Sequence, residues 1–184
     1  MVENYLKNLV NHLQDQNIEF EDGLSNEEIA RVQTTFNFIF PPDLKAFLQF
    51  ALPISLGFPN WRSDSEEEMR SRLDWPADGI CFDIEQNDFW LEEWGLKPAN
   101  LSDACELARK EVVKAPTLIP IYSHRYIPDN PPLIGNPIFS IHQTDIIYYG
   151  YNLASYFVAE FKAPPPEWPP EFPRPIKFWD KLVS

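Results

Sequence analysis

The sequence predicts an α+β fold in which a mixed, largely antiparallel sheet is flanked by helices. Helical patterns fill most of the first half of the chain, β-prone runs follow between residues 118 and 149, and one more amphipathic helix comes after them. Segregated runs of helices and strands are typical of α+β domains. The 184 residues suit one domain that needs neither a disulfide nor a metal in order to fold.

The N-terminal part contains three predicted helices. Apolar residues recur at helical spacing over 2–15. The second helix begins after Ser25, because Glu28 stands three residues later and completes a capping box, with a hydrophobic staple around it. It ends at a Phe-Pro-Pro break, and Pro42 is then placed to begin the third helix.

The middle of the chain is predicted as a short acidic helix followed by a strand. Asp64 or Ser65 is a suitable cap for a helix over 66–72, and 75-WP-76 should stop it, because proline breaks the helical hydrogen-bond ladder. Residues 79–84 are then expected to be extended. A further helix ends before Pro116.

Two strands, over 118–126 and 138–142, are predicted on either side of a proline-rich loop, and a third over 146–149. Between the last two strands lies a polar segment, His142-Gln143-Thr144-Asp145. Gln143 and Thr144 lie between two β-prone runs, as at the tip of a short hairpin. We therefore interpret this polar segment as a hairpin tip.

A metal-dependent enzyme built around His124, His142 and Asp145 is an alternative. The two histidines are symmetric about the middle of the proline loop, so antiparallel pairing would bring their Cβ atoms to ~5 Å. A metal site needs three or four ligands, however. Ser123 and His124 are neighbours on a predicted strand, so their side chains should point to opposite faces and form no catalytic dyad. No nucleophile or phosphate-loop motif is present, and we expect no enzyme, no cofactor and no catalytic or metal-binding residue.

The C-terminal segment, residues 164–184, differs in character from the predicted domain, residues 1–163. Seven of the residues between 164 and 175 are prolines, which favours polyproline II. Its large aromatic residues are Trp168, Phe172, Phe178 and Trp179. Disordered segments are poor in aromatics, so we expect the segment to pack on the domain as a strap. A free peptide ligand of the SH3 type is the alternative.

The net charge of −13 restricts the partners that the chain can bind. Nucleic acids and anionic membranes require a basic surface, whereas an acidic one steers a basic protein partner. No membrane span or secretory signal is visible, and the two isolated cysteines suit a reducing cytoplasm. The residues that we expect to contact a protein partner are Glu66, Glu67, Glu68, Trp61, Trp75, Trp94, His142 and Asp145.

Five blocks of the sequence resemble the SUKH superfamily. The segment 24-LSNEEIARVQTTFNFIFPPDLKAFL-48 is similar to its N-terminal signature of a capped helix, a proline break and a second helix. The segments 79–95, 116–128, 135–150 and 174–180 resemble one bacterial branch of that superfamily. The superfamily includes the fungal cell-wall (glucan) synthesis regulator and many bacterial immunity proteins.

The resemblance implies an α+β domain that acts by binding and shares no catalytic residues with its relatives. The leading hypothesis is therefore a non-catalytic, cytoplasmic protein-binding domain, an immunity protein that neutralises a polymorphic or contact-dependent toxin with a basic cleft. A housekeeping scaffold or regulator is the first alternative, and the metal-dependent enzyme is the second.

Overall fold

The α+β fold class is confirmed by the structure, a computed structural model that describes residues 2–167 and 170–184. In this part of the chain, helices make up about three times as many residues as strands, and the strands form two separate antiparallel sheets. The helices are α1 (Val2–Asp15), α2 (Asn26–Phe36), α3 (Pro42–Phe50), α4 (Glu66–Gln86), α5 (Leu101–Val112), α6 (Leu153–Phe161) and the short 3-10 helices η1 (Glu92–Trp94) and η2 (Trp179–Lys181). The strands are β1 (Phe20–Asp22), β2 (Ala51–Pro53), β3 (Leu118–Tyr122), β4 (Arg125–Pro128), β5 (Ile138–His142) and β6 (Asp145–Gly150).

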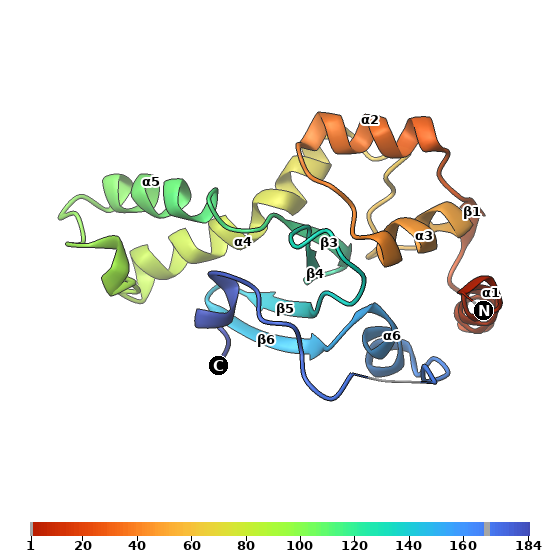
Figure 1. The fold of residues 1–184 in the computed structure, drawn as a ribbon. Coiled ribbons are helices and arrows are strands. Elements are labelled where there is room, and N and C mark those ends of the chain that lie inside the picture. The colour runs from red at the N-terminus through yellow and green to blue at the C-terminus, as the bar shows by residue number, and fades with distance from the viewer. Residues whose placement is uncertain (1, 168–169) are drawn as a thin grey trace.

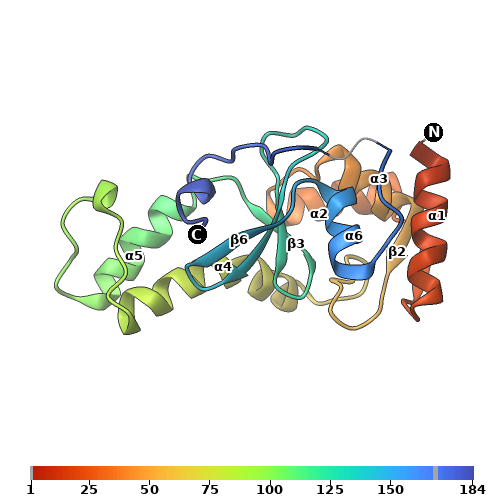
Figure 2. The same ribbon diagram turned by 90° about the horizontal axis from the view of Figure 1, so that it is seen from below.

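The main sheet separates two hydrophobic clusters. Its strand order is β3-β4-β5-β6, and all neighbours are antiparallel. Side chains alternate between the two faces of a strand. Ile127 therefore belongs to the cluster that contains residues of α1, α3 and α6, whereas its neighbour Tyr126 belongs to the cluster that contains residues of α5 and of the C-terminal segment. Figure 1 shows the paired helices α4 and α5 extending to one side of the sheet, with α1 at the opposite end of the molecule. The view from below in Figure 2 shows the same elongated arrangement.

The predicted start of α2 is confirmed in detail. Ser25 Oγ accepts from the backbone N–H of Glu28 at 3.1 Å, and the Glu28 carboxylate accepts from the N–H of Ser25 at 2.8 Å. These two bonds satisfy donors that the first turn of a helix leaves without partners.

Ser25→Ala should lower the free energy of unfolding by about 1 kcal/mol, because it removes the cap. Urea melts of the variant and the parent give this difference directly. Curves that coincide would show that the capping box contributes nothing to stability.

Two strand predictions were wrong, and the first concerns residues 79–84. They belong to α4, which continues through Pro76 to Gln86. A proline cannot donate to the carbonyl four residues before it, here that of Arg72. The buried Tyr126 hydroxyl donates to that Arg72 carbonyl at 3.0 Å instead. The helix thus continues because a side chain of the sheet replaces the hydrogen bond that Pro76 cannot make.

Tyr126→Phe should therefore destabilise the protein by about 1–3 kcal/mol, the cost of a buried carbonyl without a partner. Denaturant unfolding measures the loss, and Tyr151→Phe, a change at an exposed tyrosine, is the control. Equal stability of the two variants would contradict this explanation of how α4 passes through Pro76.

The second error concerns the predicted strand over 118–126, which is a hairpin. The chain reverses at Ser123-His124, and Tyr122 pairs with Arg125. Two-residue hairpin loops usually contain Gly, Asn or Asp, which tolerate positive φ. Here Ser123 adopts φ 50°, so the turn lacks the usual sequence signal.

The end of the C-terminal segment is part of the second cluster. Ile176, Phe178, Trp179 and Leu182 are buried there, and the Trp179 indole N–H donates to the carbonyl of Pro116 at 2.8 Å. Phe172, by contrast, is exposed. Trp168, which we also expected to pack, lies outside the described residues.

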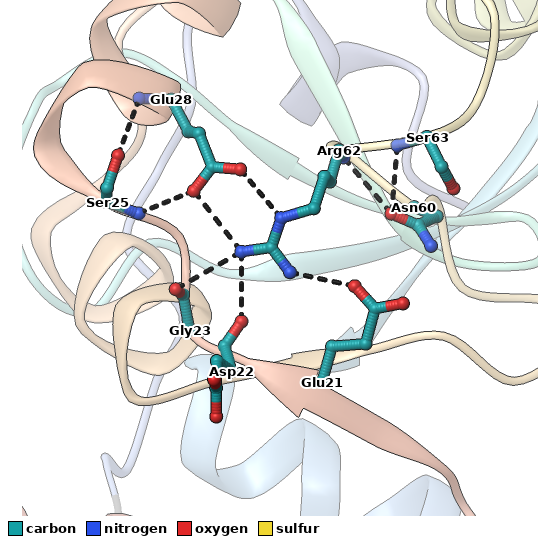
Figure 3. Close-up of polar contacts among 8 residues, drawn as sticks. All are labelled: Glu21, Asp22, Gly23, Ser25, Glu28, Asn60, Arg62 and Ser63. Carbon is teal, nitrogen blue, oxygen red and sulfur yellow. Dashed lines mark hydrogen bonds and ion pairs between the residues drawn. The ribbon is translucent and has the colours of Figure 1, made fainter.

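Arg62 joins three N-terminal segments (Figure 3). Its Nε donates to Glu28 at 2.6 Å, Nη1 donates to Glu21 at 2.8 Å, and Nη2 reaches the backbone carbonyls of residues 22–23. Hydrogen bonds from Arg62 and then from the Ser25 backbone lower the pKa of Glu28 to about 2. The guanidinium thereby holds β1, the start of α2 and the loop before α4 together, which indicates a structural role.

Candidate functional site

The polar segment His142–Asp145 forms the tip of the β5–β6 hairpin, as predicted. His142 pairs with Asp145, and Gln143 and Thr144 form the turn between them. Gln143 adopts φ 60°, in the left-handed region. The side chains of His142 and Asp145 are exposed, and those of the two turn residues are half-buried. The tip therefore presents polar groups to solvent on one side and rests on the protein on the other.

The hairpin tip is attached to α4 through Asp83. The carboxylate of Asp83 accepts from the backbone N–H of Thr144 at 2.8 Å and from its hydroxyl at 2.6 Å. Its other oxygen accepts from the side chain of Asn87 at 2.5 Å. Asp83 is only 5% exposed. Burial alone would raise its pKa, but the bonds from Thr144 and Asn87 outweigh burial and lower the pKa of this carboxyl.

Gly79 allows the hairpin tip to approach α4 at backbone distance. A Cβ atom at this position would lie 2.7 Å from the Cα atom of Gln143. Real Cβ atoms do not approach backbone that closely, so any other residue would push the turn away from the helix. Gly79 and Asp83 thus hold the tip on one face of α4.

Two half-exposed aromatic side chains, Trp75 and Phe82, lie on that face of α4. They are 49% and 47% exposed and seven residues apart, a spacing that places both on one side of a helix. Gly79 lies between them, at the point where the hairpin tip rests. We call Trp75, Phe82 and the tip His142–Asp145 the helix–hairpin surface.

Several carboxylates lie on the same helix, α4, and some of them have local partners. Glu66 pairs with Arg70 at 2.6 Å, and Glu68 accepts from the Ser65 backbone in a second capping box. These two of the three predicted acidic residues therefore stabilise the start of α4, where negative charge is favourable. The other exposed acidic residues of α4 include Glu67, Asp74 and Glu85, and also Asp78, which pairs with Arg109 of α5 at 2.6 Å.

The other two predicted tryptophans lie elsewhere. Trp61 is buried in the first cluster, where its ring lies edge-on to Phe38 and Phe40. Trp94, in η1, is half-buried and stacks on Phe178 with ring centroids 6.3 Å apart. Trp75 is thus the predicted tryptophan that lies on the same face of α4 as Gly79, where the hairpin tip rests. Phe82 was missed, because residues 79–84 were expected to form a strand.

His124 and His142 are not direct cross-strand partners. Arg125 pairs with Ser140, so the position opposite His124 is that of Ile141, whose N–H donates to the His124 carbonyl. The proline loop therefore sets the register one residue away from the symmetric pairing. Among residues 2–167 and 170–184, no three His, Cys, Asp or Glu side chains are placed to hold a metal ion.

The expectation that Ser123 and His124 point apart was wrong. Because both residues lie in a tight turn and not on a strand, Ser123 Oγ lies 3.1 Å from His124 Nδ1. Burial first, and then the neighbouring Arg125, lower the pKa of His124. The Arg125 guanidinium pairs with Glu160 at 3.0 Å and lies 3.8 Å above the ring of Tyr149. This ion pair ties β4 to α6.

The two cysteines meet across the contact between α4 and α5. Cys81 Sγ lies 3.8 Å from the carbonyl oxygen of Cys105, and Cys105 Sγ lies 3.7 Å from that of Cys81. Burial first, and then the contact with the Cys81 thiol, raise the pKa of Cys105 to about 12. A thiol that stays protonated is a poor nucleophile, so Cys105 lacks the character of a catalytic cysteine. Their sequence spacing does not indicate this proximity, because it arises from helix pairing.

Comparisons with protein-family models, with curated proteins and with solved structures find no match for this chain. The resemblance to the SUKH superfamily thus stays a prediction from the sequence blocks quoted above. Within the described residues, no helix is both long enough and apolar enough to cross a membrane.

Proposed function

We propose that this chain is a non-catalytic, cytoplasmic protein-binding domain that acts as an immunity protein and covers the basic cleft of a toxin. The observation that supports this most strongly is the helix–hairpin surface. It combines two large, half-exposed aromatic rings with a polar hairpin tip that is attached to the same helix. The resemblance to the SUKH superfamily supports the choice of a toxin as partner.

Aromatic side chains at the centre of a contact supply most of the binding free energy in many protein interfaces. Trp75 and Phe82 are suited to that role because each still has about half of its side chain to bury. The hairpin tip is held on α4 by Gly79 and Asp83, so little conformational entropy of the tip remains to be lost on binding.

The charge of the protein favours a basic partner. The net charge is −13, and exposed carboxylates such as Glu67, Asp74 and Glu85 lie on the same helix as the two aromatic side chains. Opposite charges on two proteins accelerate their encounter and bring matching surfaces together. Raising the salt concentration should therefore slow the association, because exposed charges are screened beyond ~8 Å at physiological ionic strength.

The experiment is a binding titration against any toxin found to be encoded next to this chain, with Trp75→Ala/Phe82→Ala as the test variant. Loss of two anchor residues should weaken binding about 30-fold or more, which corresponds to at least 2 kcal/mol. Leu56→Ala/Leu96→Ala, at two fully exposed apolar residues outside the helix–hairpin surface, is the matched control. If both double variants bind as tightly as the parent, the helix–hairpin surface is not the binding site.

A further inference from the structure

The outer edge of β6 is covered at one position by the last residues of the C-terminal segment. β6 is an edge strand, because the strand order of the main sheet is β3-β4-β5-β6. Val183 forms a parallel bridge with Ile146, and the backbone N–H of Ser184 donates to the Ile146 carbonyl at 3.1 Å. Figure 2 shows the C-terminus beside the hairpin end of β6. We call Val183 and Ser184 the edge cap.

The register of the sheet shows which backbone groups of β6 point away from β5. Opposite residues of an antiparallel pair alternate between hydrogen-bonded and non-hydrogen-bonded pairs. The carbonyl of Ile146 bonds the edge cap, and the N–H of its partner Ile141 donates to His124 on the other side of β5. Ile141 and Ile146 therefore form a non-hydrogen-bonded pair, and so do Phe139 and Tyr148, two residues further along. The backbone groups of Ile146 and Tyr148 thus point outward.

The edge cap covers Ile146 and leaves Tyr148 open. Within residues 2–167 and 170–184, no backbone hydrogen bond from outside the sheet reaches the N–H or carbonyl of Tyr148. Outward N–H and C=O groups on an edge strand are a template for the strand of another chain. The edge cap lies at the surface, since Val183 is half-buried and Ser184 is exposed. Removing it would free a continuous stretch of strand edge.

We propose that the edge cap keeps this chain monomeric, and that the uncapped edge of β6 pairs antiparallel with β6 of a second copy. A two-fold axis through Ile147 places Ile146 of one copy opposite Tyr148 of the other, so that their outward N–H and C=O groups bond each other. The side chain of Ile147, which is 41% exposed, then packs on its counterpart. Asp145 lies opposite Tyr149 in this register, so these carboxylates do not face each other.

The first test is sedimentation velocity of the parent and of a chain that ends at Leu182, over a series of concentrations. The shortened chain should dimerise with a dissociation constant lower than that of the parent by about tenfold or more. Because each copy carries a net charge of −13, raising the salt concentration should strengthen this dimer. The proposed toxin contact has the opposite salt dependence, and this test needs no toxin. A folded, shortened chain that dimerises no more strongly than the parent would overturn the proposal.

The second test locates the contact on β6. Ile147→Lys in the shortened chain should abolish the dimer, because two lysines would face each other across the two-fold axis. Val113→Lys adds the same charge at an exposed residue at the end of α5 and should leave the dimer intact. Equal dimerisation of these two variants would show that β6 is not the contact.

Ser184→Pro in the full chain decides the question if the shortened chain does not fold. Proline lacks the N–H that bonds the carbonyl of Ile146, so the variant should dimerise more strongly than the parent. Ser184→Ala keeps that N–H and is the matched control. Equal dimerisation of Ser184→Pro and Ser184→Ala would then overturn the proposal.

Discussion

Trp179→Ala should lower the free energy of unfolding by about 3–5 kcal/mol, the usual cost of removing a fully buried tryptophan. The ring lies in the second hydrophobic cluster and lines the junction of α4, α5 and β3. The substitution also leaves the carbonyl of Pro116 without the indole N–H that it accepts at 2.8 Å. Equilibrium denaturation in urea measures the loss.

Phe172→Ala, in the same C-terminal segment, is the control for this prediction. The side chain of Phe172 is 74% exposed, so its removal should change stability by less than about 0.5 kcal/mol. The contrast between the two variants separates a segment that completes the core from a free peptide tail. Similar small effects of both substitutions would favour the peptide-ligand alternative.

Asp83→Ala should lower the free energy of unfolding by about 2–3 kcal/mol, because buried donors left without a partner cost about 1–3 kcal/mol each. The N–H and hydroxyl of Thr144 both lose their acceptor. Because α4 then no longer holds the hairpin tip, amide exchange at Thr144 should also become faster. Asp74→Ala, at an exposed carboxylate of the same helix, should show neither effect.

The contribution of Asp83 to the free energy of unfolding should decrease as the pH falls. Its pKa is lowered in the folded protein, so it stabilises the fold above the pKa of an unfolded aspartate, about 3.9. That stabilisation is lost as the pH falls through the lower folded value. The difference in stability between the parent and Asp83→Ala should therefore be largest near neutral pH and decrease below about pH 4. If the difference in stability between the parent and Asp83→Ala instead increases as the pH falls, Asp83 does not stabilise the fold in its charged form.

The sequence predicted an element correctly where the interactions that form the element are local. The Ser25–Glu28 capping box lies within one helical turn, and the predicted tip at Gln143-Thr144 follows from the two β-prone runs beside it. The predictions failed where a distant residue changes a local rule. Pro76 is a local signal for a helix end, but the carbonyl that it leaves free accepts from the Tyr126 hydroxyl, 50 residues further along the chain.

The candidate site could be predicted only in part for the same reason. Trp75, His142 and Asp145 were identified from the sequence, but their common location depends on the contact of Gly79 with Gln143 and on Asp83. Phe82 becomes part of the helix–hairpin surface only because α4 continues past Pro76. No pattern within either segment indicates that α4 and the hairpin meet.

The most direct test of the binding account is survival of cells that express any toxin found to be encoded next to this chain, together with one of three forms of the chain. The account predicts that the parent and His124→Ala/His142→Ala protect equally, whereas folded Trp75→Ala/Phe82→Ala does not protect. The opposite pattern, in which the aromatic variant protects and the folded histidine variant fails, would contradict the account. It would then favour chemistry at His124, His142 and Asp145 over binding through the helix–hairpin surface.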